Sequence, residues 1–372
     1  MKNLMVIAGE ASGDLHGSGV IKELLKINPE LNIFGIGGDL MKQNGMELIY
    51  HCKDLSVMGF FEVIRHLPKL LEIENRIKTE IVKKNPDAIL LIDYPTFNLR
   101  IAKFAKQKNI KIGFYISPQI WAWKQRRIYD IRKFVDKIFV VFQFEKLIYE
   151  KINMPVEFVG HPLLEELRVK TSKSEFRNEN KLHGDKIIGL IPGSRTQEID
   201  KIFPVMIKAA VKLKKIYDVD FVVPIAPNRS KKEFEKYLPK YFEITFVENQ
   251  TLEVMKHSDL VFVTSGTATL ETALMETPMA IVYKTSWVTY LIGKIFIKIK
   301  NIGLVNIVAE KEIVPEFIQN NLTADNLFKY AKNSFENVEK TKMIKEDLKQ
   351  VKSLLGSVGA SKKVAEGILS LV

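Results

Sequence analysis

The feature that most constrains the fold is an alternation of short apolar runs with amphipathic stretches, which occurs twice along the 372-residue chain. Runs such as Leu4–Ala8 and Ala88–Ile92 are almost wholly apolar, as expected of parallel strands that helices cover on both faces. Strands that alternate with helices indicate βαβ units around a parallel sheet. The sequence therefore predicts an α/β protein.

A polar segment, Lys170–Lys186, interrupts the alternation and indicates a domain boundary. After about Thr323 the pattern is typical of helices only. We expect two doubly wound domains, residues 1–170 and 171–350, and a final helix, 351–372, that packs back on the first domain. The expected strands are Leu4–Ala8, Asn32–Ile36, Ala88–Ile92, Lys111–Ile116, Lys137–Val141 and Val156–Val159, then Ile187–Ile191, Asp220–Val223, Ile244–Val247, Leu260–Val263 and Met279–Val282.

Charge and cysteine content limit the partners and the cellular compartment that the chain fits. A net charge of +12 favours anionic partners, but charge alone does not choose among nucleic acid, anionic lipid and phosphorylated small molecules. No aromatic-interleaved RNA-binding signature or zinc-finger spacing accompanies the lysines. The single cysteine, Cys52, fits a reducing compartment, and no apolar run is long enough to span a bilayer. We expect a cytoplasmic protein that does not bind nucleic acid.

Three glycine-containing turns follow expected strands, at Gly9–Gly17, Pro192–Arg195 and Ser265–Glu271. Such a turn presents backbone N–H groups and the positive end of a helix dipole, which suit phosphate. Taken singly, each is more often a tight turn with a helix cap. None matches the glycine patterns of NAD-binding or ATP-binding loops. Arg195 favours phosphate, and two such turns in one domain predict a pyrophosphate-bearing donor such as a nucleotide sugar.

Two side chains are candidate bases. Asp93 directly follows the apolar run Ala88–Ile92, so it lies at the carboxyl edge of the expected sheet, where a general base would act. A turn-forming aspartate before Pro95 explains the same position equally well. His16 is the second candidate, and a solvent-facing place in the first helix is its simpler explanation.

The segment Tyr115–Trp123 holds two of the three tryptophans beside a Ser-Pro turn. Packing at a domain edge explains the aromatic residues, whereas a loop that shapes the binding crevice also explains Ser117 and Gln119. Asp218 and Asp220 imitate an Asp-x-Asp metal motif, but they begin a strand and so lie at the wrong edge of the sheet. We therefore predict no metal site and no cofactor.

Two stretches, Val57–Leu71 and Trp287–Lys300, combine apolar side chains with basic ones. Such patterns are more often core helices, but two of them in a basic chain also fit an anionic membrane surface. The candidate membrane-facing side chains are Phe60, Phe61, Val63, Ile64, Leu67 and Leu70.

Read in order, the motifs resemble those of the lipid-A-disaccharide synthase family nearly from end to end. They are Ala8–Asp14, Gly35–Gly38, Met58–Val63, Asp93–Asn98, Tyr115–Trp123, Phe158–Leu163, Ile191–Arg195 with Glu198, Ser265–Glu271, Gly303–Ala309 and Val314–Gln319. The resemblance implies the GT-B fold, in which two Rossmann-like domains face across a cleft. One departure is Thr96, where many relatives carry a second aspartate.

The resemblance implies a metal-independent, inverting transfer of 2,3-diacylglucosamine from UDP to the 6-hydroxyl of 2,3-diacylglucosamine 1-phosphate. It places the catalytic groups on Asp93 and His16. It places the donor site on Ser194, Arg195, Ser265, Gly266, Thr267, Thr269, Glu271, Asn306, Glu316 and Gln319. The acceptor side would include Gly9, Glu10, Ser12, Gly13, Asp14, Asn98, Ser117, Gln119 and Trp121.

Substrates that carry several acyl chains stay in the bilayer, so this reaction implies an enzyme at the inner face of the cytoplasmic membrane. The sequence leaves open whether the chain is a monomer or a homodimer. Three alternatives also stay open: another transferase with a UDP-sugar donor, a UDP-sugar 2-epimerase, and a basic binding protein without catalysis. The Ser265–Glu271 turn fits either transferase, whereas Tyr115–Trp123 fits only the lipid A family.

Overall fold

The computed structural model describes residues 2–55, 60–122, 125–226, 229–287, 290 and 300–372, without the side chains of residues 60–66. The chain forms two compact units. The first comprises Met1–Glu165 together with Leu355–Val372, and the second comprises Glu166–Leu354. The chain therefore returns to the first unit for its last helix.

The first unit is built on a parallel sheet with the order β3-β2-β1-β4-β5-β6-β7. The described strands are β1 (Asn3–Ala8), β2 (Asn32–Gly37), β3 (Glu47–His51), β4 (Ala88–Ile92), β5 (Lys111–Tyr115), β6 (Lys137–Val140) and β7 (Val156–Phe158). The strand β4 is buried along its whole length, which explains its continuous apolar sequence. The order reverses between β1 and β4, where the two strands pair from Leu4↔Ala88 to Ala8↔Ile92.

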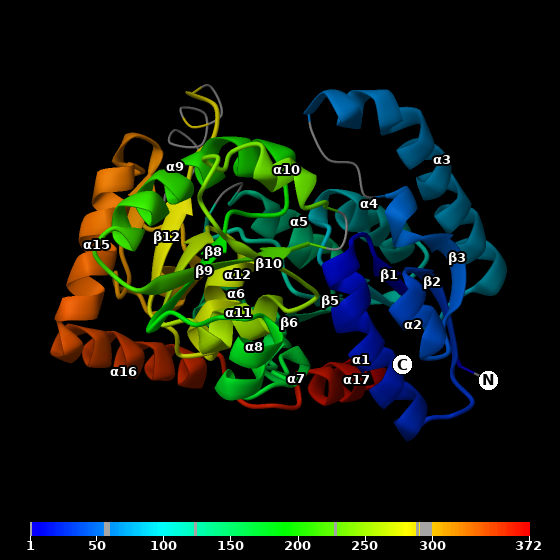
Figure 1. Ribbon diagram of the computed structural model, residues 1–372. Helices are drawn as coiled ribbons and strands as arrows, with labels where there is room; N and C mark the ends of the chain where they lie inside the picture. Colours follow the sequence, from blue (N-terminus) through cyan, green and yellow to red (C-terminus); the bar gives the residue numbers. More distant parts are fainter. Residues whose placement is uncertain (1, 56–59, 123–124, 227–228, 288–289, 291–299) are drawn as a thin grey trace. The chain divides into compact units, whose positions relative to one another are not determined.

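Helices cover both faces of this sheet (Figure 1). They are α1 (Ala11–Ile27), α2 (Asp39–Gln43), α3 (Phe60–Lys84), α4 (Pro95–Lys106), α5 (Arg127–Phe134), α6 (Gln143–Glu150) and α17 (Ala360–Leu369), with the 3-10 helix η1 at Cys52–Asp54 and α7 (Leu163–Glu166) at the boundary between the units.

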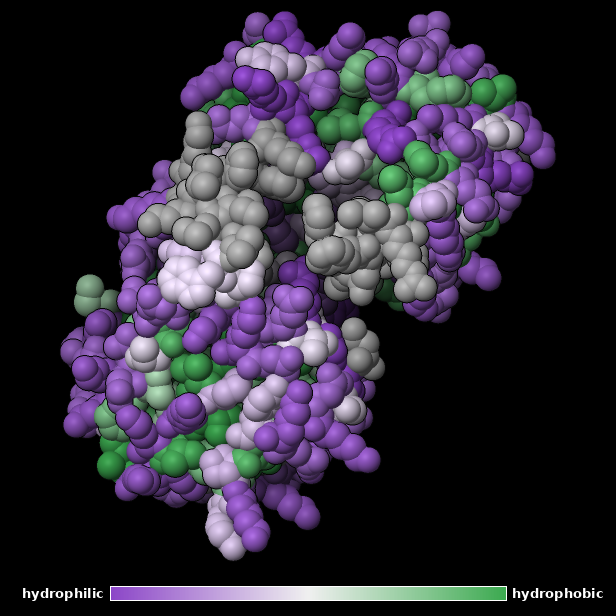
Figure 2. Space-filling view, turned by 90° about the horizontal axis from the view of Figure 1, so that it is seen from above, coloured by the Kyte–Doolittle hydropathy of each residue, from purple (hydrophilic) through white to green (hydrophobic). Residues whose placement is uncertain are grey.

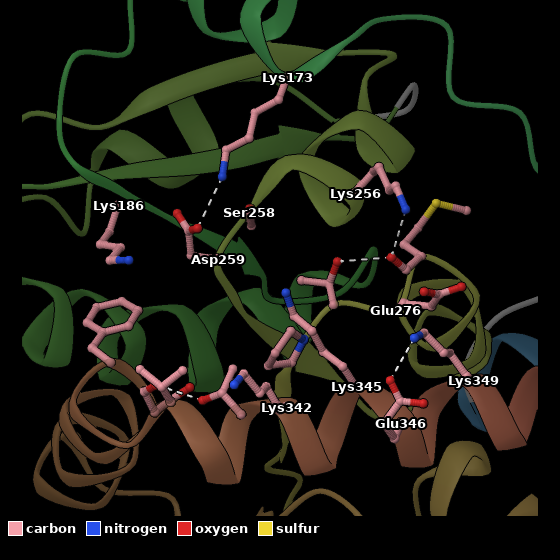
Figure 3. A pocket seen from close by; sticks show the side chains of 17 residues that line it. Lys173, Lys186, Lys256, Ser258, Asp259, Glu276, Lys342, Lys345, Glu346 and Lys349 are labelled. Carbon is pink, nitrogen blue, oxygen red and sulfur yellow. Dashed lines mark hydrogen bonds and ion pairs between the residues drawn. The ribbon is translucent and has the colours of Figure 1, made fainter.

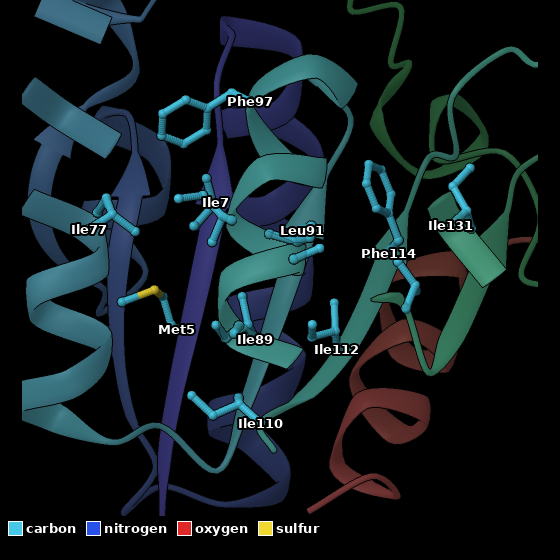
Figure 4. Close-up of a cluster of buried hydrophobic side chains, with 14 of the residues drawn as sticks. Met5, Ile7, Ile77, Ile89, Leu91, Phe97, Ile110, Ile112, Phe114 and Ile131 are labelled. Carbon is cyan, nitrogen blue, oxygen red and sulfur yellow. The ribbon is translucent and has the colours of Figure 1, made fainter. Parts of the chain in front are cut away.

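Alternate residues of the central strands point to one face of this sheet. Met5 and Ile7 of β1 lie beside Ile89 and Leu91 of β4, and α3 and α4 cover them (Figure 4). On the other face α17 packs beside α1. The helix α17 also lies close to β6, because a Cβ atom at Gly367 would lie 2.3 Å from the ring of Phe139. The predicted α/β fold is confirmed in this unit.

The second unit has a parallel sheet with the order β10-β9-β8-β11-β12-β13. Its described strands are β8 (Lys186–Ile191), β9 (Val219–Ile225), β10 (Thr245–Glu248), β11 (Leu260–Thr264), β12 (Met279–Tyr283) and β13 (Glu316–Ile318). Its described helices are α8 (Lys173–Glu179), α9 (Thr196–Lys214), α10 (Lys232–Glu235), α11 (Thr251–His257), α12 (Thr267–Leu274), α14 (Leu304–Val308), α15 (Ala324–Glu336) and α16 (Val338–Leu354), with the 3-10 helix η2 at Gln319–Asn321. The two sheets confirm the prediction of two Rossmann-like halves.

Sequence patterns missed two strands and one helix. The strands β3 and β13 are the edge strands of their sheets, and the residues of β13 are only half-buried, so their apolar pattern is weak. The polar segment that we expected to separate the domains contains α8. Ser172 and Glu175 form a capping box at its start, and Phe176 is fully buried in a small cluster of the second unit.

No described helix is both long and apolar enough to cross a bilayer. On the face that Figure 2 shows, hydrophilic residues cover most of the described surface. Apolar residues appear there in smaller areas between them.

Candidate functional site

One candidate site lies at the carboxyl edge of the first sheet. Because β1 and β4 are paired, the turn after Ala8 lies beside the turn after Ile92. Gly9 permits this contact, since a Cβ atom there would lie 2.4 Å from the ring of Tyr94. The Tyr94 hydroxyl donates to the carbonyl oxygen of Leu55, 2.8 Å away, which fixes the ring. The structure thus brings the first glycine-containing turn next to Asp93.

Asp93 is held in an uncommon backbone conformation. Asp93 and Tyr94 have φ angles of +47° and +48°, in the left-handed region that non-glycine residues seldom adopt. The amide of Asn98, which is fully buried, donates to the carbonyl oxygens of Ile92 at 3.2 Å and of Asp93 at 2.6 Å. The sequence suggested Asn98 as an acceptor contact, and the structure gives its amide a role in holding the Asp93 turn.

Burial is the main cause that raises the pKa of Asp93 above its ordinary value. The charge of Glu10 raises that pKa further, while the backbone N–H of Tyr94 and the charge of His16 oppose the rise. The two predicted bases and Glu10 are therefore near enough to interact electrostatically. A carboxyl group whose pKa is raised is a stronger base once it is deprotonated.

Other residues of the first turn have structural partners. The buried carboxylate of Asp14 accepts from the backbone N–H groups of Gly38 at 2.7 Å, Leu40 at 3.1 Å and Met41 at 3.0 Å. These bonds attach α1 to the start of α2. Ser12, by contrast, is exposed beside the buried Gly13.

Glu145 of α6, which the sequence did not single out, contacts the loop after β5. Its buried carboxylate accepts from Trp121 Nε1 at 3.1 Å and from the Ser117 hydroxyl at 3.4 Å. Burial raises the pKa of Glu145 to about 7, although these bonds oppose the rise. Gln119 of the same loop is exposed, and Trp123 lies outside the described residues.

His161 is a second buried residue that sequence reasoning passed over as a site. Burial lowers its pKa to about 3, and the charge of His16 contributes to the fall. The imidazole is therefore neutral near pH 7. Its place in the Phe158–Leu163 motif was the only signal in the sequence.

Another candidate site lies at the carboxyl edge of the second sheet. The strands β8 and β11 are paired, so the turns that follow them are neighbours. The hydroxyl of Thr264 donates to the carbonyl oxygen of Pro192, 3.1 Å away, and so joins the two turns directly. The two predicted phosphate-binding turns therefore form one surface of this unit.

The turn between β8 and α9 is shaped around Gly193 and Glu198. Gly193 has a φ angle of +102°, and a Cβ atom there would lie 2.3 Å from a carboxylate oxygen of Glu198. Glu198 also accepts from Arg195 Nη1 at 3.3 Å. The Arg195 side chain is 65% exposed, which leaves its guanidinium accessible to an anion. Ser194 is exposed beside it.

Arg229 braces this turn and was not identified from the sequence. Its Nε donates to the carbonyl oxygen of Ser194 at 2.8 Å, and its Nη1 donates to the hydroxyl of Thr196 at 2.8 Å. Glu233 in turn accepts from Arg229 Nη1 at 3.1 Å. An isolated arginine about 35 residues after a turn carries no local sequence signal.

The turn between β11 and α12 is more open. Gly266 has a φ angle of +155°, and no heavy atom lies within 4 Å of the place a Cβ atom would take. Thr267 is exposed beside it and Glu271 is half-buried. Thr269 is fully buried and its hydroxyl donates to Gly266, so it holds the turn together. The backbone around Gly266 is the part of this turn that a ligand can approach.

Glu316 and Ser265, two other predicted donor-site residues, hold neighbouring segments. Glu316 accepts from the backbone N–H groups of Ile302 at 2.8 Å and Gly303 at 3.0 Å, at the start of α14. The Ser265 hydroxyl donates to the carbonyl oxygen of Ile302 at 2.9 Å, which links Glu316 to the open turn.

Asn306 and Gln319 use both ends of their amides within the protein. Asn306 is fully buried, accepts from Ile313 N at 3.0 Å and donates to the carbonyl oxygen of Val314 at 2.8 Å. Gln319 accepts from Thr285 N at 3.1 Å. The structure thus places both amides in the framework of the second unit.

No cluster of three or more potential metal ligands occurs among the residues that the structure describes. Asp218 and Asp220 lie at the amino end of β9, away from the edge that carries the two turns. The carboxylate of Asp220 accepts from Gly184 N at 2.7 Å.

The candidate membrane segment, Val57–Leu71, includes the start of α3. The side chains of Phe60, Phe61, Val63 and Ile64 lie outside the described residues. Leu67 is 45% exposed, whereas Leu70 packs against the core of the first unit. The second basic segment is described only in part, and there Trp287 is 57% exposed.

The sequence model of the family described as lipid-A-disaccharide synthetase matches residues 4–367. The chain belongs to the lipid-A-disaccharide synthase family. Members of this family are glycosyltransferases of lipid A synthesis. The lipid-A-disaccharide synthase of Geobacter sulfurreducens is 38% identical to the chain, and the match covers 99% of the chain and 97% of the relative. The lipid-A-disaccharide synthase 1 of Legionella pneumophila strain Philadelphia 1 is 40% identical, over 95% of the chain and 93% of the relative.

Solved structures of similar fold have much lower sequence identity. The UDP-GlcNAc 2-epimerase from Neisseria meningitidis bound to UDP-GlcNAc has a TM-score of 0.68 at 16% identity, covering 100% of both chains. The Staphylococcus aureus MnaA structure with UDP has a TM-score of 0.70 at 16% identity, covering 100% of this chain and 98% of that one. At such identities the likeness establishes the fold alone.

Proposed function

We propose that this lipid-A-disaccharide synthase family member transfers 2,3-diacylglucosamine from UDP to the 6-hydroxyl of 2,3-diacylglucosamine 1-phosphate. The products would be the β-1,6-linked disaccharide and UDP. The observation that carries the proposal is the pair of joined turns in the second unit. They present the starts of α9 and α12 beside an accessible arginine, which is a suitable setting for a diphosphate.

In this proposal the second unit binds the donor. Backbone N–H groups around Ser194 and Gly266–Thr267 would bind the diphosphate, and Arg195 would neutralise the charge that develops as UDP leaves. Glu271 would complete the pocket beside them. Asn306, Glu316 and Gln319 would fix the segments that border it. Stabilisation of the leaving group by fixed donors needs no metal ion.

The first unit would supply the base. The carboxylate of Asp93 would accept the proton of the acceptor 6-hydroxyl as its oxygen attacks the anomeric carbon. The bond from that carbon to the UDP oxygen breaks on the opposite side, so the configuration inverts. His16 and Glu10 would set the proton affinity of Asp93. Glu145 would hold the Ser117–Trp121 loop at the acceptor side.

A product assay tests this proposal. Purified protein would be incubated with both lipid substrates, and UDP and the disaccharide would be measured by chromatography and mass spectrometry. We expect the two products in equal amounts, with unchanged turnover in EDTA. Conversion of UDP-GlcNAc to its 2-epimer without any disaccharide would contradict the proposal. Loss of turnover in EDTA that magnesium restores would contradict its metal-free chemistry.

We also propose that the start of α3 attaches the protein to an anionic membrane surface. The support is the exposed Leu67, with Leu71 39% exposed one helical turn further on. Exposed leucines can enter the acyl boundary, and full burial of such a side chain contributes roughly 1.5–3 kcal/mol. Basic side chains in the same segment would meet lipid phosphates.

Vesicle sedimentation tests the attachment. The double variant Leu67→Ser with Leu71→Ser should bind vesicles that contain phosphatidylglycerol several-fold more weakly and keep its melting temperature. Leu147→Ser, at a leucine on α6 that is 56% exposed, is the matched control and should bind normally. Leu70→Ser should instead lower the melting temperature, because Leu70 packs on the core. Normal vesicle binding by the double variant would reject the attachment.

A further inference from the structure

The second unit contains a cavity of about 670 Å³ at the amino edge of its sheet. It is lined from α8, the start of β8, the end of α11, the loop between α12 and β12, and the helices α15 and α16 (Figure 3). Lys186 begins β8 at this cavity, and Ile191 ends β8 beside the Pro192 turn. At roughly 3.3 Å per residue the strand separates the two places by about 17 Å. The cavity is therefore distinct from the candidate donor site.

Lysines dominate the charge of this cavity, which we call the lysine pocket. Six lysines and three carboxylates line it: Lys173, Lys186, Lys256, Lys342, Lys345 and Lys349, with Asp259, Glu276 and Glu346. Figure 3 shows lysine side chains from several elements around the same space. The lining therefore has an excess of positive charge.

The three carboxylates already have lysine partners. Asp259 pairs with Lys173 at 3.1 Å, and Glu346 pairs with Lys349 at 2.7 Å. Glu276 pairs at 3.9 Å with Lys352, a residue that does not line the pocket. The acidic groups of the lining are thus neutralised within the protein.

Three lysines of the pocket remain without a carboxylate partner among the described residues: Lys186, Lys256 and Lys345. Lys256 donates to the carbonyl oxygen of Met275 at 3.3 Å, which leaves its charge uncompensated. Ammonium groups that converge on one cavity repel one another, and an anion bound among them would remove that repulsion.

Ser334 provides an independent indication of a ligand. It lines the pocket, it is only 8% exposed, and its hydroxyl has no hydrogen-bond partner among the residues described. A buried polar group without a partner is unusual and calls for one. Ammonium groups and a hydroxyl are the donors that phosphate oxygens accept from.

We propose that the lysine pocket binds an anion that carries one or more phosphate groups. Lys186, Lys256 and Lys345 contribute the positive charge, and the Ser334 hydroxyl donates a hydrogen bond. Met275 and Phe335 in the lining offer apolar contact to an organic part of the ligand. This site does not depend on the transfer reaction proposed above.

Calorimetry with inorganic pyrophosphate tests the site. The full-length protein would carry Arg195→Ala, so that the donor turns bind weakly, and UDP would be left out because its own phosphates would compete for the pocket. Lys345→Gln and Lys186→Gln should each weaken pyrophosphate binding by roughly tenfold or more, because each removes a charged hydrogen bond. Lys340→Gln is the matched control, since Lys340 is an exposed lysine of the same helix α16 outside the pocket. Ser334→Ala should weaken binding several-fold without lowering the melting temperature.

A vesicle arm distinguishes a soluble phosphate from a lipid headgroup. Sedimentation would compare phosphatidylcholine vesicles with and without phosphatidic acid, again in the Arg195→Ala background and without UDP. Pyrophosphate binding that the Lys345 variant loses supports a soluble ligand. Loss of binding to phosphatidic acid vesicles in that variant supports a headgroup. The proposal is overturned if neither probe binds, or if Lys345→Gln and Lys186→Gln bind both probes as tightly as Lys340→Gln does.

Discussion

The two sheets are built in the same way, but their carboxyl edges carry different chemical groups. In the first unit the residue after β4 is Asp93, a carboxyl group whose pKa burial raises. In the second unit the turn after β8 carries Gly193, which lies against Glu198, and the turn after β11 carries Gly266, whose backbone is open. A buried titratable group suits proton transfer, whereas open backbone turns suit anion binding. A few residues after each strand therefore give two similar sheets different chemical groups at the same edge.

The largest expected effect concerns Asp93 in the first unit. Asp93→Asn keeps the shape of the side chain but removes the base, so turnover should fall on the order of 10²–10⁴-fold. UDP affinity, measured by calorimetry, should stay unchanged because the donor turns belong to the other unit. His16→Gln should retain more activity than Asp93→Asn. Turnover of Asp93→Asn close to the unchanged protein would remove Asp93 from the mechanism.

The buried asparagines of the two units, Asn98 and Asn306, should contribute unequally to the stability of the protein. Asn306→Ala would leave Ile313 N, Val314 N and the Val314 carbonyl oxygen without their side-chain partner, at about 1–3 kcal/mol for each buried group left unsatisfied. Asn98→Ala removes only two donated bonds and should cost less.

Differential scanning calorimetry checks the stability prediction, because it follows both units. A lower melting temperature for Asn98→Ala than for Asn306→Ala would contradict it.

A variant of Arg195 tests whether the turns of the second unit bind the diphosphate. Arg195→Ala should weaken UDP binding by roughly 10- to 100-fold, since a charged hydrogen bond to phosphate contributes about 1.5–3 kcal/mol. Arg168→Ala, at an exposed arginine of the same unit, is the control and should bind UDP normally. Calorimetry would measure the UDP affinity of both variants. Equal UDP affinity for the two variants would mean that the diphosphate lies elsewhere.

The smallest effect concerns pH. A base must be deprotonated to act, so activity should be present above the raised pKa of Asp93 and fall as pH drops through it. Because the charge of Glu10 contributes to raising that pKa, Glu10→Gln should move the acidic limb of the kcat/KM profile to lower pH. A limb that stays in place, or moves to higher pH, would show that Glu10 does not act on the base.

Sequence patterns were sufficient to predict the repeated strand-helix units of the fold. Buried parallel strands such as Ala88–Ile92 need apolar residues at every position, so their runs are visible without a structure. The edge strands β3 and β13 escaped detection because much of each is only half-buried. The helix α8 escaped because one buried residue, Phe176, anchors an otherwise polar segment.

The candidate site was predictable only as far as local motifs allow. The strand-turn-helix pattern located Asp93 and the glycine-containing turns. It could not show that Asp14 binds the start of α2, because those bonds join residues 24–27 positions apart. Arg229 in the second unit and Glu145 in the first hold their loops through similarly distant contacts, and no short motif indicates these contacts.

Hydrogen exchange of the full-length protein with and without UDP tests the division of roles most directly. The account predicts slower exchange at backbone amides of residues 194–199 and 266–271 in the second unit, where the diphosphate would bind. The Asp93 turn, residues 93–98, should change less because no donor group is assigned to it. Slower exchange confined to residues 9–16 and 93–98, with residues 194–199 and 266–271 unaffected, would contradict the account.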